Sequence, residues 1–235
     1  MALNVQKALR KAQGLARKGD SAGAAALFRE VLEQYPGNRQ AAQGLSQLQQ
    51  VPSRAAGESH QFQLALQDVV RLFNAGHSQR ALQQAEVLVR QHPREPVLYN
   101  LIGAALTDLQ QYDRAIAAYR AAIEIHPRYA EAYSNLGAAC NELGHHSAAI
   151  TAYTRAIELQ PDMPEAHNNL GNAYRESGLP EQAIACYRHA ISLKPDFAAA
   201  HNNLGCAMSD LGRYAEGAAS SARALELRPT FAKAR

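Results

Sequence analysis

Three asparagines recur along the chain at one interval. Asn135, Asn169 and Asn203 are 34 residues apart, and Asn168 and Asn202 directly precede the last two. A primary amide both donates and accepts hydrogen bonds, so an evenly spaced row of asparagines can hold the backbone of an extended peptide while reading little of its side-chain sequence. In the other interpretation, paired asparagines only solvate the polar side of a helix. The sequence leaves both interpretations open.

Acidic residues follow the asparagines at the same interval. Glu142, Glu176 and Asp210 each lie seven residues after one of them, and Asn172 lies three residues after Asn169. Side chains three and seven residues apart share one side of a helix. We therefore expect these residues to add contacts to the hydroxyls or basic side chains of a bound peptide.

Cysteines and histidines form no comparable pattern. Cys140, Cys186 and Cys206 fall at unrelated places within the interval, which predicts neither disulfides nor a ligand set. Two of them should be small core residues, and Cys206 should face the polar side. His145 and His146 are adjacent, so their side chains diverge and a solvated turn is expected rather than a metal site. We predict no metal, no cofactor and no catalytic centre.

The elements that position these residues are marked by prolines with the same spacing. A sustained 34-residue period is typical of stacked helix-turn-helix units, each of which completes its neighbour's core. With each proline as position 32, five units follow one another at 62–95, 96–129, 130–163, 164–197 and 198–231. The prolines are Pro93, Pro127, Pro161, Pro195 and Pro229.

Within these units, small and large residues alternate in register. Position 8 is glycine in four units, position 20 is alanine in four, and position 24 is tyrosine in three. Position 15, where a residue of positive φ should end the first helix, is glycine in four units and Gln110 in the fifth. Position 4 carries a tyrosine or a histidine in four units, including His167 and His201, which we expect to pack.

This arrangement resembles the tetratricopeptide repeat (TPR) family. The resemblance implies an all-α fold, a right-handed superhelix of antiparallel helix-turn-helix units, with the first helix of each unit lining a concave groove. The Asn-Leu-Gly runs also resemble the asparagine ladder of the O-GlcNAc transferase superhelix. There, asparagines bind the backbone of substrate peptides, which implies that role for Asn135, Asn169 and Asn203.

Upstream of the array the spacing breaks. Residues 5–38 still match one unit, and residues 39–50 match a first helix without a partner, so 1–50 is predicted to be a small N-terminal module. The stretch 51–61 contains Pro52, Gly57 and Ser59 and is predicted to be a linker. Residues 232–235 are interpreted as the start of a truncated further helix.

Charge bears on the class of partner. Residues 1–60 hold eight Lys and Arg against four Asp and Glu, which leaves 16 against 17 for residues 61–235. The array therefore lacks the basic stripe that nucleic acids require. No run approaches membrane-spanning length and no signal peptide is evident, so neither membrane insertion nor export is predicted and a cytoplasmic location is expected.

The leading hypothesis is a non-catalytic scaffold that binds a protein or peptide, as an extended segment or a partner helix, in the concave groove. One alternative is the substrate-recruiting N-terminal region of a larger glycosyltransferase or sulfotransferase. Another is a platform that self-associates into a homo-oligomer through exposed helical ends.

Overall fold

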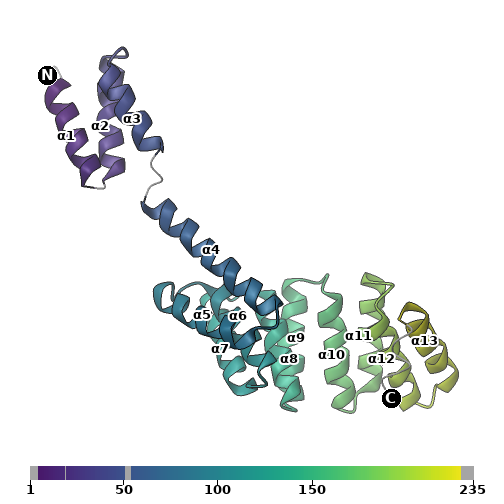
Figure 1. Ribbon diagram of the computed structural model, residues 1–235. Helices are drawn as coiled ribbons and strands as arrows, with labels where there is room; N and C mark the ends of the chain where they lie inside the picture. The colour runs from purple at the N-terminus through teal and green to yellow at the C-terminus, as the bar shows by residue number, and fades with distance from the viewer. Residues whose placement is uncertain (1–4, 19, 51–53, 229–235) are drawn as a thin grey trace. The chain divides into compact units, whose positions relative to one another are not determined.

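The computed structural model describes residues 5–18, 20–50 and 54–228, and these residues form thirteen α-helices and no strand (Figure 1). The predicted all-α repeat superhelix is confirmed. The chain divides into two compact units, Met1–Ala65 and Leu66–Arg235, each of which is described by itself. The predicted helix start at 232–235 and the last proline, Pro229, lie outside the described residues.

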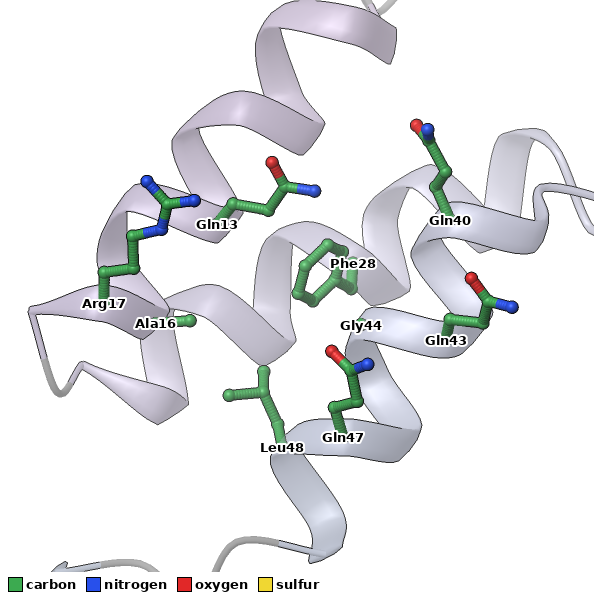
Figure 2. A pocket seen from close by; sticks show the side chains of 9 residues that line it. All are labelled: Gln13, Ala16, Arg17, Phe28, Gln40, Gln43, Gly44, Gln47 and Leu48. Atoms are coloured by element: carbon green, nitrogen blue, oxygen red, sulfur yellow. The ribbon is translucent and has the colours of Figure 1, made fainter.

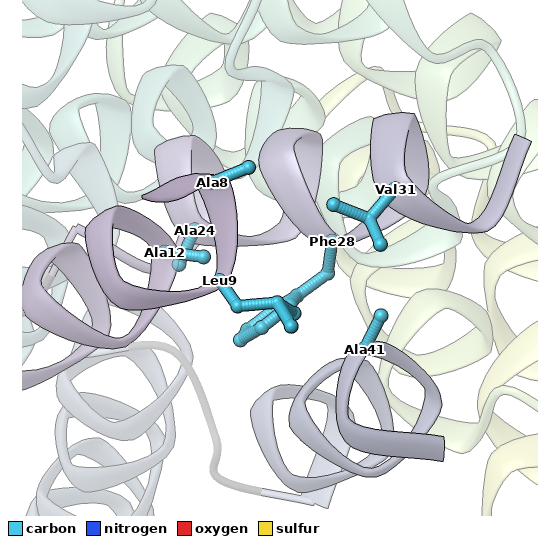
Figure 3. Packing of buried hydrophobic residues seen from close by; sticks show 7 residues of the cluster. All are labelled: Ala8, Leu9, Ala12, Ala24, Phe28, Val31 and Ala41. Atoms are coloured by element: carbon cyan, nitrogen blue, oxygen red, sulfur yellow. The ribbon is translucent and has the colours of Figure 1, made fainter. Parts of the chain in front are cut away.

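The first unit contains three short helices that surround one aromatic ring. They are α1 (Val5–Arg17), α2 (Ser21–Gln34) and α3 (Arg39–Gln50). Phe28 of α2 is 2% exposed and lies among small and aliphatic side chains from all three helices (Figure 3). Asp20 caps α2 by accepting a hydrogen bond from the backbone N–H of Gly23 at 2.9 Å. The predicted helix pair of residues 5–38 is thus present as α1 and α2.

The stretch predicted as a linker is helical from Arg54 onward, because α4 runs over Arg54–Asn74. Residues 51–53 lie outside the described part of the chain. Pro52 precedes Arg54 in the sequence, and a proline before a helix start removes no helical hydrogen bond. A single glycine or serine inside a helix lowers its stability by at most about 1 kcal/mol. The alanines Ala55 and Ala56 favour the helix. The first helix of the array is consequently longer than its 34-residue period requires.

The second unit stacks helices in pairs, and beyond α4 and its turn each helix packs on the next (Figure 1). The second helix of each pair ends two residues before one of the regularly spaced prolines, as expected because proline cannot continue a helix. After α4 the helices are α5 (Ser78–Gln91), α6 (Pro96–Asp108), α7 (Tyr112–Ile125), α8 (Ala130–Glu142), α9 (His146–Leu159), α10 (Pro164–Glu176), α11 (Pro180–Leu193), α12 (Ala198–Asp210) and α13 (Tyr214–Leu227).

Glycine and tyrosine fit together within three of these pairs. A Cβ atom built on Gly171 would lie 2.5 Å from the ring of Tyr187, and Gly103 and Gly137 face their own tyrosines equally closely. In the last pair a serine replaces the tyrosine, and α12 and α13 approach through Gly205 and Gly217 instead. The small residues therefore let the two helices of each unit touch.

The turn between paired helices needs a residue of positive φ. The glycines at position 15 have φ between 72° and 76°, and Gln110, the predicted exception, takes the same region with φ 58°. A residue with a Cβ pays for this conformation, by about 1–2 kcal/mol. The turn geometry is thus kept in α6–α7 although the glycine is absent.

Candidate functional site

The first helices of successive units lie against one another. Contacts join α6 to α8, α8 to α10 and α10 to α12, so side chains at one repeat position form a row across the array. Asn135, Asn169 and Asn203 stand in such a row on α8, α10 and α12, and all three are half-buried. The structure therefore brings the predicted asparagines together.

Two of these asparagines also donate hydrogen bonds to other asparagines of the neighbouring repeat. The Nδ2 atom of Asn135 donates to Oδ1 of Asn100 at 3.0 Å. The Nδ2 atom of Asn203 donates to Oδ1 of both Asn168 and Asn172, at 3.0 Å each. Sequence reasoning missed this use and missed Asn100. The sequence contained a signal for this bond, because Asn100 precedes Asn135 by 35 residues, one more than the repeat period.

The bonds decide which amide groups remain free for a ligand. Asn168 is 5% exposed and donates to Oδ1 of Asn169 at 3.2 Å, so it belongs to the interior. Oδ1 of Asn172 already accepts from Asn203 and from the Tyr187 hydroxyl, the latter at 2.8 Å. Within the described residues, the side-chain carbonyls of Asn135 and Asn203 accept no hydrogen bond. The amino group of Asn169 is bonded to Tyr153, which leaves one of its two hydrogens for a ligand. Asn202 is half-buried on α12.

The acidic residues at position 13 lie beside the second helix of the preceding unit. Glu176 accepts from Nδ2 of Asn141 at 2.7 Å and lies 3.5 Å from Nδ1 of His146. Asp108 accepts from the Ser78 hydroxyl in the same way. Glu176 therefore joins two repeats as well as facing solvent. Glu142 and Asp210 are exposed.

The first helices as a group are acidic. Together α6, α8, α10 and α12 carry six carboxylates and one arginine, Arg175. The carboxylates are Asp108, Glu131, Glu142, Glu165, Glu176 and Asp210. Among the described residues, only Glu165 of these six pairs with a lysine or arginine: Lys194, the residue that caps the paired helix α11, lies 3.1 Å away. Opposite charges attract over a Debye length of about 8 Å at physiological salt. The exposed carboxylates of these helices thus give this face a negative potential.

Histidines at position 4 pack as predicted and also bind the backbone. Nε2 of His167 donates to the carbonyl of Pro161 at 3.0 Å, and its ring centroid lies 4.2 Å from that of His189. His201 makes the same bond to Pro195 at 3.0 Å. Burial lowers the pKa of His167 below its usual value. This histidine is therefore held neutral as a structural donor.

The cysteines and turn histidines show no reactive arrangement. Cys140 is buried, and burial raises the pKa of its thiol and raises that of Cys186 to about 11. Cys206 is half-buried on α12. His146 is bonded to Asn141 at 3.0 Å rather than freely solvated, whereas His145 is exposed. Within the described ranges, no three side chains of His, Cys, Asp or Glu gather as metal ligands would.

Hydropathy of the helices bears on membrane contact. Among the residues that the structure describes, no helix combines the length and apolar character that a membrane span needs.

Several solved structures share this architecture. MamA is 28% identical, with a TM-score of 0.62 over 69% of this chain and 95% of that chain. A MamA fragment from Desulfovibrio magneticus RS-1 is 21% identical, with a TM-score of 0.65 over 72% and 96%. YrrB, described as a TPR protein with an unusual peptide-binding site, is 15% identical, with a TM-score of 0.59 over 86% and 92%. The last two likenesses concern the fold alone.

Sequence comparison gives the family directly. No curated protein matches the chain. Profiles of the TPR repeat match residues 103–144, 139–178 and 171–212. Tetratricopeptide repeat profiles also match residues 8–38 and 198–231. These matches span more than half of the sequence, and the chain belongs to the tetratricopeptide repeat family.

Proposed function

We propose that the array is a non-catalytic, cytoplasmic protein-interaction scaffold that binds an extended, basic peptide in its groove. The observation that carries this proposal is the row of Asn135, Asn169 and Asn203 beside the acidic first helices. The carbonyls of Asn135 and Asn203 offer acceptors to a peptide backbone, and the amino group of Asn169 offers one donor hydrogen beside its bond to Tyr153. The description of YrrB as having a peptide-binding site lends support from the fold.

The repeat spacing favours an extended ligand. Contacting helices pack about 8–10 Å apart, and an extended chain advances about 3.3 Å per residue. Each repeat therefore corresponds to about three ligand residues. A basic side chain at every third residue would meet the exposed carboxylates of Glu142 and Asp210 in turn, while Asn135, Asn169 and Asn203 hold the backbone between them.

The test is binding of a fluorescent peptide of Lys-Ser-Gly triplets, measured by anisotropy. Replacing Asn135, Asn169 and Asn203 together by Ala should weaken binding by about tenfold to several hundredfold, at about 0.5–1.5 kcal/mol for each lost bond. Helicity and melting temperature are recorded for each variant, because two of these asparagines also join repeats. Titration well below the melting temperature separates binding from folding.

The matched control changes three exposed amides on the second helices. Gln83, Gln84 and Gln182 of α5 and α11 are replaced by Ala, which removes the same groups without changing charge. This control should bind the peptide as the unchanged chain does. Equal loss in both variants, or no binding of the lysine peptide to the unchanged chain, would contradict the proposal.

The same groove would serve as the recruiting region of a larger glycosyltransferase or sulfotransferase.

Self-association is a second candidate, favoured by one helix. Tyr214 and Leu225 of α13 are 72% and 41% exposed, and only Gly217 and Ala224 of this helix are buried. A homo-oligomer would bury this apolar surface. Light scattering after gel filtration should then report more than one chain, and Tyr214→Ser with Leu225→Ser should return a monomer. A monomer in the unchanged chain at high concentration removes this candidate.

A further inference from the structure

A cleft lies within the first unit, and none of its lining residues belongs to the asparagine row. Its volume is about 610 Å³, and nine side chains of α1, α2 and α3 line it (Figure 2). Clefts of about 300–1,000 Å³ are typical of sites that bind small ligands or short peptide segments. The lining residues are Gln13, Ala16, Arg17, Phe28, Gln40, Gln43, Gly44, Gln47 and Leu48.

Amide groups dominate the two walls. Gln40, Gln43 and Gln47 are three and four residues apart, so they share one face of α3, and Gln13 and Arg17 share one face of α1. Figure 2 shows the two sets on opposite sides of the Phe28 ring. In the described part of the chain, none of these five side chains makes a hydrogen bond or ion pair. Their donors and acceptors are available to a ligand.

The floor of the cleft is apolar and closely packed. A Cβ atom on Gly44 would lie 2.4 Å from the ring of Phe28, so the glycine lets α3 rest directly on that ring. Leu48 and Ala16 are half-buried at the same end of the cleft. A leucine-sized side chain can therefore be covered here, where each buried CH₂ contributes about 0.8 kcal/mol.

The charge of the lining residues indicates which polar group of a ligand this cleft favours. Arg17 is the only charged residue among the nine that line the cleft. It occupies position 13 of its repeat, since residue 5 is position 1, and the array carries Asp108, Glu142, Glu176 and Asp210 at that position. A guanidinium binds a carboxylate through two parallel hydrogen bonds, which are stronger than neutral ones. The cleft thus favours an anionic group where the array favours a cationic one.

We propose that this cleft binds a short extended segment of a partner protein that carries a Glu or Asp side chain next to an apolar residue. The carboxylate pairs with Arg17, the apolar side chain lies against Leu48 and Ala16, and Gln13 and Gln43 bind the backbone between them. The site is independent of the asparagine row, so either can fail without the other.

The experiment uses the full chain and a fluorescent Gly-Ser peptide that contains one Leu-Ser-Glu sequence. Arg17→Gln should weaken its binding about tenfold to a hundredfold, the worth of a charged hydrogen bond. A peptide with Gln in place of Glu should bind the unchanged chain as weakly as the Glu peptide binds Arg17→Gln. Arg29→Gln is the matched control, because Arg29 is exposed on α2 and its replacement by Gln changes the net charge by the same amount as Arg17→Gln.

A second pair of variants tests the walls without touching charge. Gln13→Ala with Gln43→Ala should weaken the Glu and Gln peptides by the same factor. Equal loss in Arg17→Gln and Arg29→Gln overturns the proposal, because the attraction would then come from overall charge. Failure of the Glu peptide to bind the unchanged chain also overturns it. So does displacement of the peptide by a single-stranded oligonucleotide at lower concentration than by the unlabelled Glu peptide.

Discussion

The two units place amides on the same face of the same kind of helix but use them differently. In the array, Asn135 and Asn203 donate to neighbouring repeats, so part of each side chain is occupied by the fold. In the first unit, Gln43 and Gln47 make no such bond within the described residues. The charged position beside them is also reversed, from carboxylate in the array to Arg17. One repeat scaffold thus presents two amide-bearing surfaces with opposite charge beside the amides, for which we propose opposite ligand preferences.

The difference teaches how a polar row serves two purposes. A shorter asparagine reaches only the adjacent helix, and its cross-repeat bond holds the register of the stack. A longer glutamine extends past the contact and remains free for a ligand, at a larger cost in side-chain entropy on binding. The asparagine groove should therefore be more rigid and the glutamine cleft more adaptable.

The largest expected effect on stability comes from comparing two tyrosines of the array, one buried and one exposed. Tyr187 is fully buried against Gly171, whereas Tyr214 is 72% exposed. Tyr187→Ala should lower the free energy of unfolding by about 3–5 kcal/mol, because truncating a buried aromatic leaves a cavity. Tyr214→Ala should change it by less than about 0.5 kcal/mol. Urea unfolding followed by circular dichroism measures both, and similar losses would refute the assigned core.

The next effect tests the amides themselves. Asn203→Ala removes two cross-repeat bonds and should cost about 1–3 kcal/mol of stability, at about 0.5–1.5 kcal/mol each. Gln43→Ala in the first unit removes none and should stay within about 0.5 kcal/mol. Thermal melts of the two variants give the comparison. If Gln43→Ala proves the more costly, the distinction between occupied and free amides is lost.

A smaller effect concerns the turn that lacks glycine. Gln110→Gly should stabilise the array by about 1 kcal/mol, because Gln110 holds φ 58° at a cost that glycine does not pay. Gln84→Gly, in the exposed middle of α5, should instead destabilise by about 1 kcal/mol. Opposite shifts in the urea midpoint are expected, and shifts of the same sign would argue against a strained turn.

The smallest effect depends on pH. Burial holds the pKa of His167 below its usual value near 6.5, so the unfolded chain takes up a proton that the folded chain resists. The stability that the neutral ring contributes is present above that value and is lost as pH falls below it. In His167→Tyr the hydroxyl can bind the same carbonyl, as Tyr99 binds that of Pro93 at 3.1 Å, without titrating there.

The pH prediction is checked by urea unfolding at pH 7.5 and pH 5.5. The unchanged chain should lose more stability between these two conditions than His167→Tyr does. An identical loss in both proteins would show that His167 does not contribute to the pH dependence.

Much of the fold follows from residues that repeat every 34 positions. The prolines predict the helix ends, and Gln110 is predicted as the site of positive φ because the neighbouring turns have glycine. The helix from Arg54 could not be predicted, because Pro52 and Gly57 are ordinary breakers. Their effect depends on which side of a helix start they occupy, and a periodic pattern does not report that.

The candidate sites were predictable in outline only. Repeat spacing places Asn135, Asn169 and Asn203 on one face, but the bond from Asn135 to Asn100 depends on how far adjacent helices are offset. In the glutamine cleft only Gln13 and Gln47 are 34 residues apart, and one pair does not make a row, while Gln40 and Gln43 fall at other positions of the repeat. Such a site becomes visible only when the helices are placed around Phe28.

The most direct test is a nuclear magnetic resonance titration that observes the side-chain amides of the full chain. The Lys-Ser-Gly peptide should shift the signals of Asn135, Asn169 and Asn203 and leave Gln13 and Gln43 unchanged. The Leu-Ser-Glu peptide should do the reverse. If each peptide shifts both sets of amides to the same extent, the two surfaces do not differ in preference and the account is contradicted.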